Sequence, residues 1–189
     1  RVMELNGVDV AKVKVPPEGQ WVLRGDRGIT YAKRMPENST LSQGEWWPED
    51  YSGEPLVSFS AEEGGELGLK IGDTVTVNVL GRNITARIAN FRNVEWESLS
   101  INFVMVFSPN TFAGAPHAWL ATLTDPGASA ADDARVMRDV TNAFPGITSV
   151  RVKDALDVAS QMVAQIAVAI RAAASIALVV SVLVLAVAI

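Results

Sequence analysis

The fold is decided by the stretch TVTVNVLGRNITARIANF, residues 74–91. In its first half, valines alternate with polar residues, and this period of two is typical of a strand with one buried face. Residues 81–83, Gly-Arg-Asn, then turn the chain into a second run, 84–91. Tight hairpin turns favour glycine because it tolerates positive φ. The stretch therefore predicts a β-hairpin within a β-rich domain.

Further strands are expected outward from this hairpin. Asn6-Gly7 separates two apolar runs, 1–5 and 8–15, and this dipeptide predicts an opening hairpin. Residues 35–55 are rich in Pro and Gly, and we expect them to form a long surface loop. The remaining strands expected in this part of the chain cover residues 21–24, 29–33, 56–60 and 101–107.

Two helices are expected in the domain. Residues 61–67 are amphipathic, although two adjacent glycines within them disfavour a helix. Ser129 followed by Asp132 has the spacing of a capping box. Apolar residues then recur at steps of three and four until a Pro-Gly pair ends the pattern. The second helix is therefore predicted over 129–143.

Apolar runs on both sides of the second helix predict a βαβ unit. Runs 117–124 and 147–152 are apolar enough to be buried strands, and the helix connects them. The predicted fold class is α+β. Its domain covers residues 1–153, with a β-rich part over about 40–112 and the βαβ unit over about 117–152.

The charged residues all lie in the first 171 positions. There are 16 Lys and Arg against 21 Asp and Glu, a net charge of −5, and none follows Arg171. Residues 172–189 form an uncharged run of 18, which is near the lower limit for a membrane span. No Gly or Pro follows Gly146. A helix over 154–189 would be about 54 Å long, against about 30 Å of hydrocarbon in a bilayer.

We therefore expect a stalk that continues into a transmembrane helix at about 168–189, with a buried core helix or a signal-like segment as the alternatives. Gln161 and Gln165 continue the polar side of the stalk, and Arg171 immediately precedes the apolar run. An arginine there can extend its guanidinium to the interface while its methylenes stay in the apolar zone. These three side chains are the candidates for the interface with membrane lipid.

Composition argues against several kinds of chemistry. The acidic chain has no cluster of Lys and Arg, so we expect no nucleic-acid partner. It has no cysteine, which removes disulfides and thiolate nucleophiles. His117 is the single histidine, and no motif supplies the neighbours that a catalytic or metal site requires. We expect no catalytic site, no metal and no cofactor, and we expect His117 to be structural or simply exposed.

Three tryptophans are candidates for contact with a partner or substrate. Trp46 and Trp47 stand in a Gly- and Pro-flanked loop, and indoles bury a large area at little entropic cost. The alternative is that one of the two fills the domain's own core. Adjacent residues on an extended chain point in opposite directions, so the other would then remain available. Trp96, between the strands expected at 84–91 and 101–107, is the third candidate.

The order of several short motifs carries a family resemblance. They are GEWW at 44–47, LVSF at 56–59 with Ala61, LGLKIGDTV at 67–75 and ITARI at 84–88. With the βαβ pattern and the terminal apolar run, they resemble the extracytoplasmic domain of MacB/FtsX-like ABC transporter permeases.

The similarity covers about residues 40–189. The Trp-rich loop and the RGDRG segment at 24–28 are most similar to the large YbbP-type branch, which has two such domains.

The resemblance implies a noncatalytic permease subunit that works with a separate cytoplasmic ATPase. Residues 1 to about 155 would lie on the periplasmic side of a bacterial inner membrane. ATP-driven movement would reach them through the stalk, since a helix without a hinge transmits displacement. The cargo would be a hydrophobic or envelope substrate, and a periplasmic protein is a further candidate partner.

A membrane-anchored binding or adhesion module without an ATPase remains the alternative to a permease. Further apolar spans on both sides of these residues would favour the permease. The chain begins at Arg1 without a leader and ends within its apolar run, so we expect it to be a fragment of a longer protein.

Overall fold

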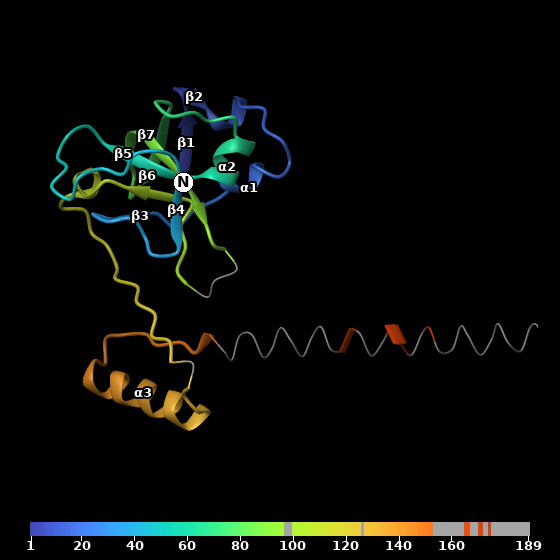
Figure 1. Ribbon diagram of the computed structural model, residues 1–189, viewed down its shortest axis with the longest axis vertical. Coiled ribbons are helices and arrows are strands. Elements are labelled where there is room, and N and C mark those ends of the chain that lie inside the picture. The colour runs from blue at the N-terminus through green and yellow to red at the C-terminus, as the bar shows by residue number, and fades with distance from the viewer. Residues whose placement is uncertain (97–99, 126, 153–164, 167–169, 172–173, 175–189) are drawn as a thin grey trace, which may run out of the picture. The chain divides into compact units, whose positions relative to one another are not determined.

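The computed structural model describes residues 1–96, 100–125, 127–152, 165–166, 170–171 and 174 (Figure 1). The chain divides into two units, which we call unit 1 (Arg1–Leu123) and unit 2 (Thr124–Ile189). Within the described residues, unit 1 contains every strand and unit 2 contains the longest helix.

Unit 1 is built on a mixed sheet of eight strands. In chain order they are β1 (Val2–Leu5), β2 (Val8–Asp9), β3 (Thr30–Tyr31), β4 (Ser39–Gly44), β5 (Leu56–Ser60), β6 (Thr74–Val79), β7 (Arg82–Val94) and β8 (Met105–Phe107). Their order across the sheet is β2-β1-β6-β7-β5-β8-β3, and β4 also pairs with β7. The pairs β5–β7 and β3–β8 are parallel, and the others are antiparallel. The expected β-rich domain is thus confirmed.

The hairpin predicted from residues 74–91 is formed by β6 and β7. The two strands pair from Thr74 with Arg87 to Val79 with Arg82. Leu80 and Gly81 make the turn with φ angles of 51° and 84°. Positive φ at both central residues is the requirement of a type I′ turn, whose twist matches that of the flanking strands. The second strand is longer than expected, because β7 has 13 residues.

The opening hairpin is confirmed in its turn but not in its length. Asn6 and Gly7 have φ angles of 51° and 73° between β1 and β2. β2 ends at Asp9, whose carboxylate accepts a hydrogen bond of 2.8 Å from the backbone N–H of Ala11. This local bond turns the chain into the 3₁₀ helix η1 (Val10–Lys12), so the strand expected as far as residue 15 is wrong beyond Asp9.

Two other predictions in unit 1 are wrong. Residues 21–24 were expected to form a strand, but helix α1 (Gln20–Leu23) occupies this position and buries Val22 and Leu23. The expected loop over 35–55 contains β4, which pairs with β7. Four residues are too few for apolar periodicity to distinguish helix from strand, and β4 has polar residues on both faces.

The main core lies between the sheet and the two short helices α1 and α2 (Ala61–Glu66). Figure 1 shows α1 and α2 next to each other, and the backbone at Gly19 meets the Glu66 side chain. The strand residues most deeply buried in this core are Val57, Phe59, Val75, Val77, Ala86, Ile88 and Phe107. The predicted helix at 61–67 is therefore confirmed despite its two glycines.

Unit 2 contains the predicted capped helix, α3 (Ala130–Ala143). The Ser129 hydroxyl accepts a hydrogen bond from the Asp132 N–H, and the Asp132 carboxylate accepts one from the Ser129 N–H, at 3.3 and 3.1 Å. Hydrogen bonds from the Ser129 hydroxyl and backbone N–H lower the pKa of the Asp132 carboxyl below its ordinary value. None of the residues of α3 is buried.

The expected βαβ unit is not formed in the part of the chain that the structure describes. Neither 117–124 nor 147–152 contains a strand residue in the described positions, and Trp119 and Val150 are 86% and 77% exposed. A strand needs partners for its backbone groups. Neither run pairs with a strand here, and the boundary between the units falls within the first run, after Leu123. Apolar composition alone was therefore not enough. The strand expected over 101–107 is likewise reduced to β8.

The expected stalk and membrane helix at 154–189 fall almost entirely outside the described residues. Gln161 is among the positions not described, whereas Gln165 and Arg171 have helical backbone and are exposed. Across the residues that are described, no helix combines the length and the apolar character needed to span a bilayer.

Substitution of Gly64 by Ala tests the packing of α2 on β7. A Cβ at Gly64 would lie 2.4 Å from Cε1 of the Phe91 ring, so the ring or the helix must move. We expect Gly64→Ala to lower the free energy of unfolding by about 1–3 kcal/mol. Urea denaturation followed by tryptophan fluorescence measures this loss.

Gly65→Ala is the matched control in the same helix. A Cβ at Gly65 meets nothing within 4 Å, so this variant should be neutral or more stable by up to about 1 kcal/mol. Equal losses in the two variants would contradict the close contact between Gly64 and Phe91.

Candidate functional site

The loop that holds the tryptophan pair begins where β4 leaves β7. Gly44 ends β4 with a φ of 78°, and a Cβ there would lie 2.4 Å from the carbonyl oxygen of Ala89. Only glycine fits so close to the neighbouring strand. The next carbonyl, that of Glu45, accepts a hydrogen bond of 3.0 Å from Nδ2 of the buried Asn90. The start of the loop is therefore fixed on the sheet before the indoles begin.

Both indoles are held against the segment that follows β3. Nε1 of Trp46 donates to the carbonyl oxygen of Lys33, and Nε1 of Trp47 donates to that of Ala32, each at 2.9 Å. The two rings stack at a centroid distance of 4.2 Å with 32° between their planes. Because each N–H has a backbone partner, the pair fastens its loop to the β3 end of the sheet.

The two tryptophans differ in burial. Trp47 is 5% exposed and forms a second, smaller core with Leu56 and Val106, whereas Trp46 is half-buried. The prediction that one indole fills the domain's own core is confirmed for Trp47. The expectation that the two rings point in opposite directions is wrong, because the chain is no longer an extended strand after Gly44 and the rings stack on each other.

The structure places Trp96 just beyond β7, where its side chain is 40% exposed. Sequence reasoning passed over a comparable residue, Trp21 of α1, which is 41% exposed and has the guanidinium of Arg27 5.0 Å from its ring. Partner or substrate contact stays a prediction for Trp46, Trp47 and Trp96.

His117 lies within a row of aromatic rings that ends at the exposed Trp119. Its Nδ1 is 3.1 Å from the carbonyl oxygen of Ala115, and its ring meets Tyr31 and Trp119 edge to face at 5.8 and 5.2 Å. Tyr31 in turn contacts Phe112 near the core. Among the described residues, no three His, Cys, Asp or Glu side chains are grouped so that they could hold a metal ion. His117 thus takes part in edge-to-face contacts with two aromatic rings.

A buried polar cluster that sequence reasoning missed lies where β7 passes β5 and α2. Arg92 is 1% exposed, and one terminal nitrogen of its guanidinium donates to the Phe103 carbonyl oxygen. Its Nε and second terminal nitrogen have no hydrogen-bond partner among the described residues, nor does Oε2 of the buried Glu63. Ser58 and Asn90 are also fully buried and form a cross-strand pair.

The charge of Arg92 is costly in this position. Burial lowers the pKa of its guanidinium to about 10, and the nearby Glu63 carboxylate acts in the opposite direction. A buried cation is tolerated when an anion compensates it, and removal of that anion leaves an unpaired charge in the interior. Asn90 and Arg92, on either side of Phe91 in the second half of β7, were the available sequence signal.

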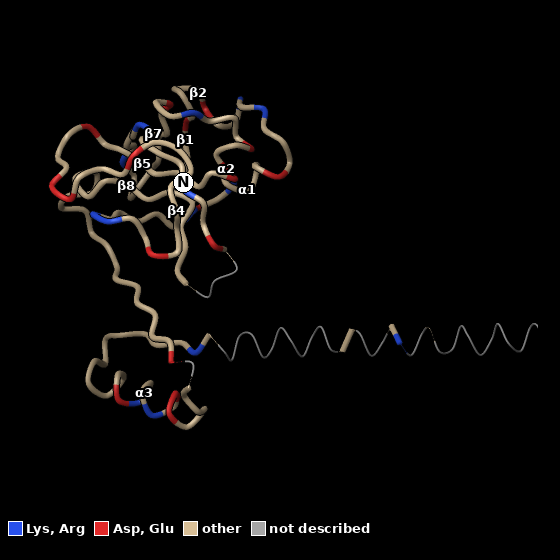
Figure 2. Tube along the Cα trace, in the orientation of Figure 1, with Lys and Arg blue, Asp and Glu red and all other residues tan. Residues whose placement is uncertain are grey.

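Over most of unit 1, charges do not gather by sign. Figure 2 shows acidic and basic residues interspersed along its loops and strand ends. The ion pairs there, Arg34–Glu49 and Arg87–Glu54, are both largely solvent-exposed. Exposed pairs of this kind contribute little stability. The distribution offers no basic stripe in the described part of unit 1 on which a nucleic acid could lie.

Comparison with known proteins gives one point of reference for function. The chain is 30% identical over 111 residues to the uncharacterized ABC transporter permease YbbP of Escherichia coli (strain K12). The match covers 57% of this chain and 13% of that protein's length. No family model and no solved structure matches the chain. The similarity supports a relation to ABC transporter permeases in general, as the motif order predicted.

The interaction between Glu63 and Arg92 can be tested by substitution. We expect Glu63→Gln to lower the free energy of unfolding by about 3 kcal/mol, because it leaves the Arg92 cation without a buried anion. Glu62→Gln, an exposed position in the same helix, should change it by less than about 0.5 kcal/mol. Chemical denaturation of the three proteins measures the difference.

Arg92→Met in the Glu63→Gln background separates charge from packing. Removing both polar partners should recover most of the loss, since no unpaired charge then remains. If Glu63→Gln is no more destabilising than Glu62→Gln, the two buried groups are not coupled.

Proposed function

We propose that this chain is the extracytoplasmic part of an ABC transporter permease of the MacB/FtsX-like type. It couples ATP hydrolysis by a separate cytoplasmic subunit to movement of an outer domain, for export or extraction of a hydrophobic or envelope substrate. The observation that carries the proposal is the 30% identity over 111 residues to an ABC transporter permease.

The distribution of charge along the sequence supports a membrane boundary near Arg171. All 37 charged residues precede the apolar run 172–189. In the proposed arrangement unit 1 and the part of unit 2 up to about residue 155 lie on the periplasmic side of a bacterial inner membrane. Arg171 meets the lipid head groups and Gln161 and Gln165 lie on the stalk above them.

Large exposed apolar side chains support a role within an assembly. Trp119, Leu120 and Leu123 follow each other closely along unit 1 and are all more than half exposed. Apolar side chains gathered on a surface commonly mark contacts with other parts of a complex. A permease domain on the periplasmic side has such contacts with further segments of the permease and with periplasmic proteins.

The mechanical role depends on residues 154–189. No Gly or Pro interrupts them, and helix propensity is highest for the Ala that recurs along them. A helix that crosses the interface without a kink carries a displacement of its membrane end to the domain at its other end. In this arrangement the separate subunit hydrolyses ATP and this chain transmits the movement. The proposed role therefore needs no catalytic side chain in this chain.

Ala164→Pro in the full-length protein tests this coupling. Proline breaks a helix at about 3 kcal/mol or more. We expect the ATPase subunit to co-purify with the wild-type protein and to hydrolyse ATP in nanodiscs. ATP should change hydrogen exchange in residues 127–152 of the wild type, and the variant should lose this change while hydrolysis continues.

Ala164→Leu is the control, because leucine is also a good helix former. It should keep both hydrolysis and the ATP-dependent change in exchange. An unaltered exchange response in Ala164→Pro would contradict the stalk, and the absence of any co-purifying ATPase would contradict the permease.

A further inference from the structure

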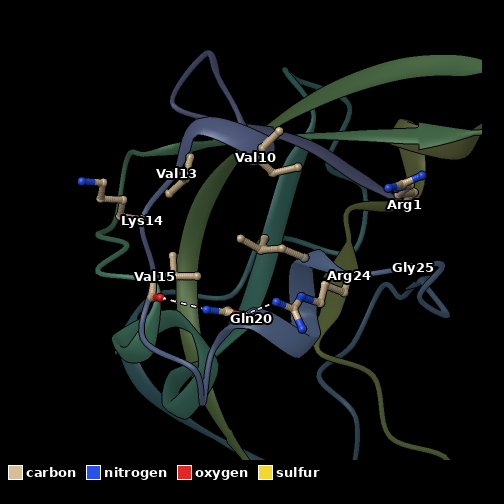
Figure 3. Close-up of a pocket in the computed structure, with 10 residues that line it drawn as sticks. Arg1, Val10, Val13, Lys14, Val15, Gln20, Arg24 and Gly25 are labelled. Atoms are coloured by element: carbon tan, nitrogen blue, oxygen red, sulfur yellow. Dashed lines mark hydrogen bonds between the residues drawn. The ribbon is translucent and has the colours of Figure 1, made fainter.

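A cavity of about 570 Å³ lies in unit 1 between η1 and α1, and it has no part in the proposed coupling (Figure 3). Its volume falls within the range of sites that hold small molecules. Residues from the segment 10–15 form one side, and residues 20–25 form the other. Both segments are anchored to the main core, so the shape of the cavity is fixed by the fold.

Part of the cavity's wall is apolar. Val10, Val13 and Val15 are partly buried and pack against the main core, and Leu23 is 8% exposed and belongs to that core. Aliphatic side chains from two segments therefore face one space without filling it. Such a wall favours a hydrocarbon group, because its burial removes apolar surface from water.

An exposed guanidinium lies beside the apolar part of the wall. Nε2 of Gln20 donates to the Val15 carbonyl oxygen at 3.4 Å, and Oε1 of the same side chain accepts a hydrogen bond from Arg24. Figure 3 shows Arg24 reaching towards Gln20 among the lining residues. A guanidinium has five N–H donors. Gln20 takes one of them, and the others of Arg24 have no partner in the described structure.

The charges that line the cavity are all positive. Arg1, Lys14 and Arg24 are present, and no Asp or Glu is among the described residues that line it. In Figure 3 Lys14 points away from the other lining residues and Arg1 lies at the opposite end, so the inference rests chiefly on Arg24. A local excess of cations is unusual in a chain with a net charge of −5.

We propose that this cavity binds a single-chain fatty-acyl anion. The acyl chain lies against the valines and Leu23, and the carboxylate accepts hydrogen bonds from Arg24. The planar fork of a guanidinium matches a carboxylate in two parallel hydrogen bonds, which gives both charge and direction. A neutral or cationic amphiphile of the same length lacks this match. The binding requires no ATPase, so it can be tested independently of the permease proposal.

Photocrosslinking locates the ligand directly. The 189-residue chain in uncharged phosphatidylcholine nanodiscs is irradiated with a diazirine-bearing palmitate, and the labelled peptides are identified by mass spectrometry. We expect labelling in residues 10–25. Laurate should compete for this label, whereas dodecyltrimethylammonium and inorganic phosphate should not.

Charge reversal at the guanidinium tests its role. Loss of hydrogen bonds to a charged group should reduce labelling of residues 10–25 about tenfold in Arg24→Glu. Arg138→Glu makes the same charge change at an exposed position of α3 that does not line the cavity, and it should label like the wild type. Arg24→Gln, a milder change, should also lose labelling, and thermal unfolding of each variant shows that the fold is kept.

Four outcomes would overturn the proposal. The first is labelling found only outside residues 10–25, and the second is equal labelling of the Arg24 variants and the wild type. The third is competition by dodecyltrimethylammonium equal to that by laurate, and the fourth is competition by phosphate alone. The last result would mean that the cavity recognises an anion and not an amphiphile.

Discussion

The pairing of β7 with three strands is the constraint on which unit 1 depends. β5 takes one edge of β7, and β6 and β4 follow each other along the other edge. At the point where β4 leaves this edge, Gly44 approaches the Ala89 carbonyl so closely that no side chain fits. Trp46 and Trp47 come directly afterwards and fasten the loop to the end of β3. One long strand therefore positions the core, the loop and the stacked indoles together.

The features predictable from sequence were those with a local physical signal. Both hairpins have a turn whose two residues adopt positive φ, and the cap of α3 lies within four residues. β4 was missed because its partner is distant in sequence and its own residues are polar. The stacking of Trp46 on Trp47 was missed for a related reason, since it follows from the geometry after Gly44. The burial of Arg92 was also missed, because only the elements packed against β7 show that its charge is buried.

The expected strands on both sides of α3 illustrate the opposite error. Residues 117–124 and 147–152 have the apolar composition of buried strands, but neither run pairs with a strand in the described structure. Composition reports what a segment can bury, whereas pairing depends on what lies beside it. Their exposed side chains are consistent with a chain that matches 13% of a longer permease. Most of unit 1, by contrast, is organised around its own core.

An extracytoplasmic position of unit 1 is what the proposed function requires most. The chain contains no cysteine, so a single one can be placed at Leu80, which is 73% exposed in the turn between β6 and β7. Leu80→Cys is made in the full-length protein after any other cysteine has been replaced. Cells with a permeabilised outer membrane are then treated with a membrane-impermeant maleimide. Labelling before the inner membrane is broken is the predicted result, and labelling only after it is broken would contradict the proposed topology.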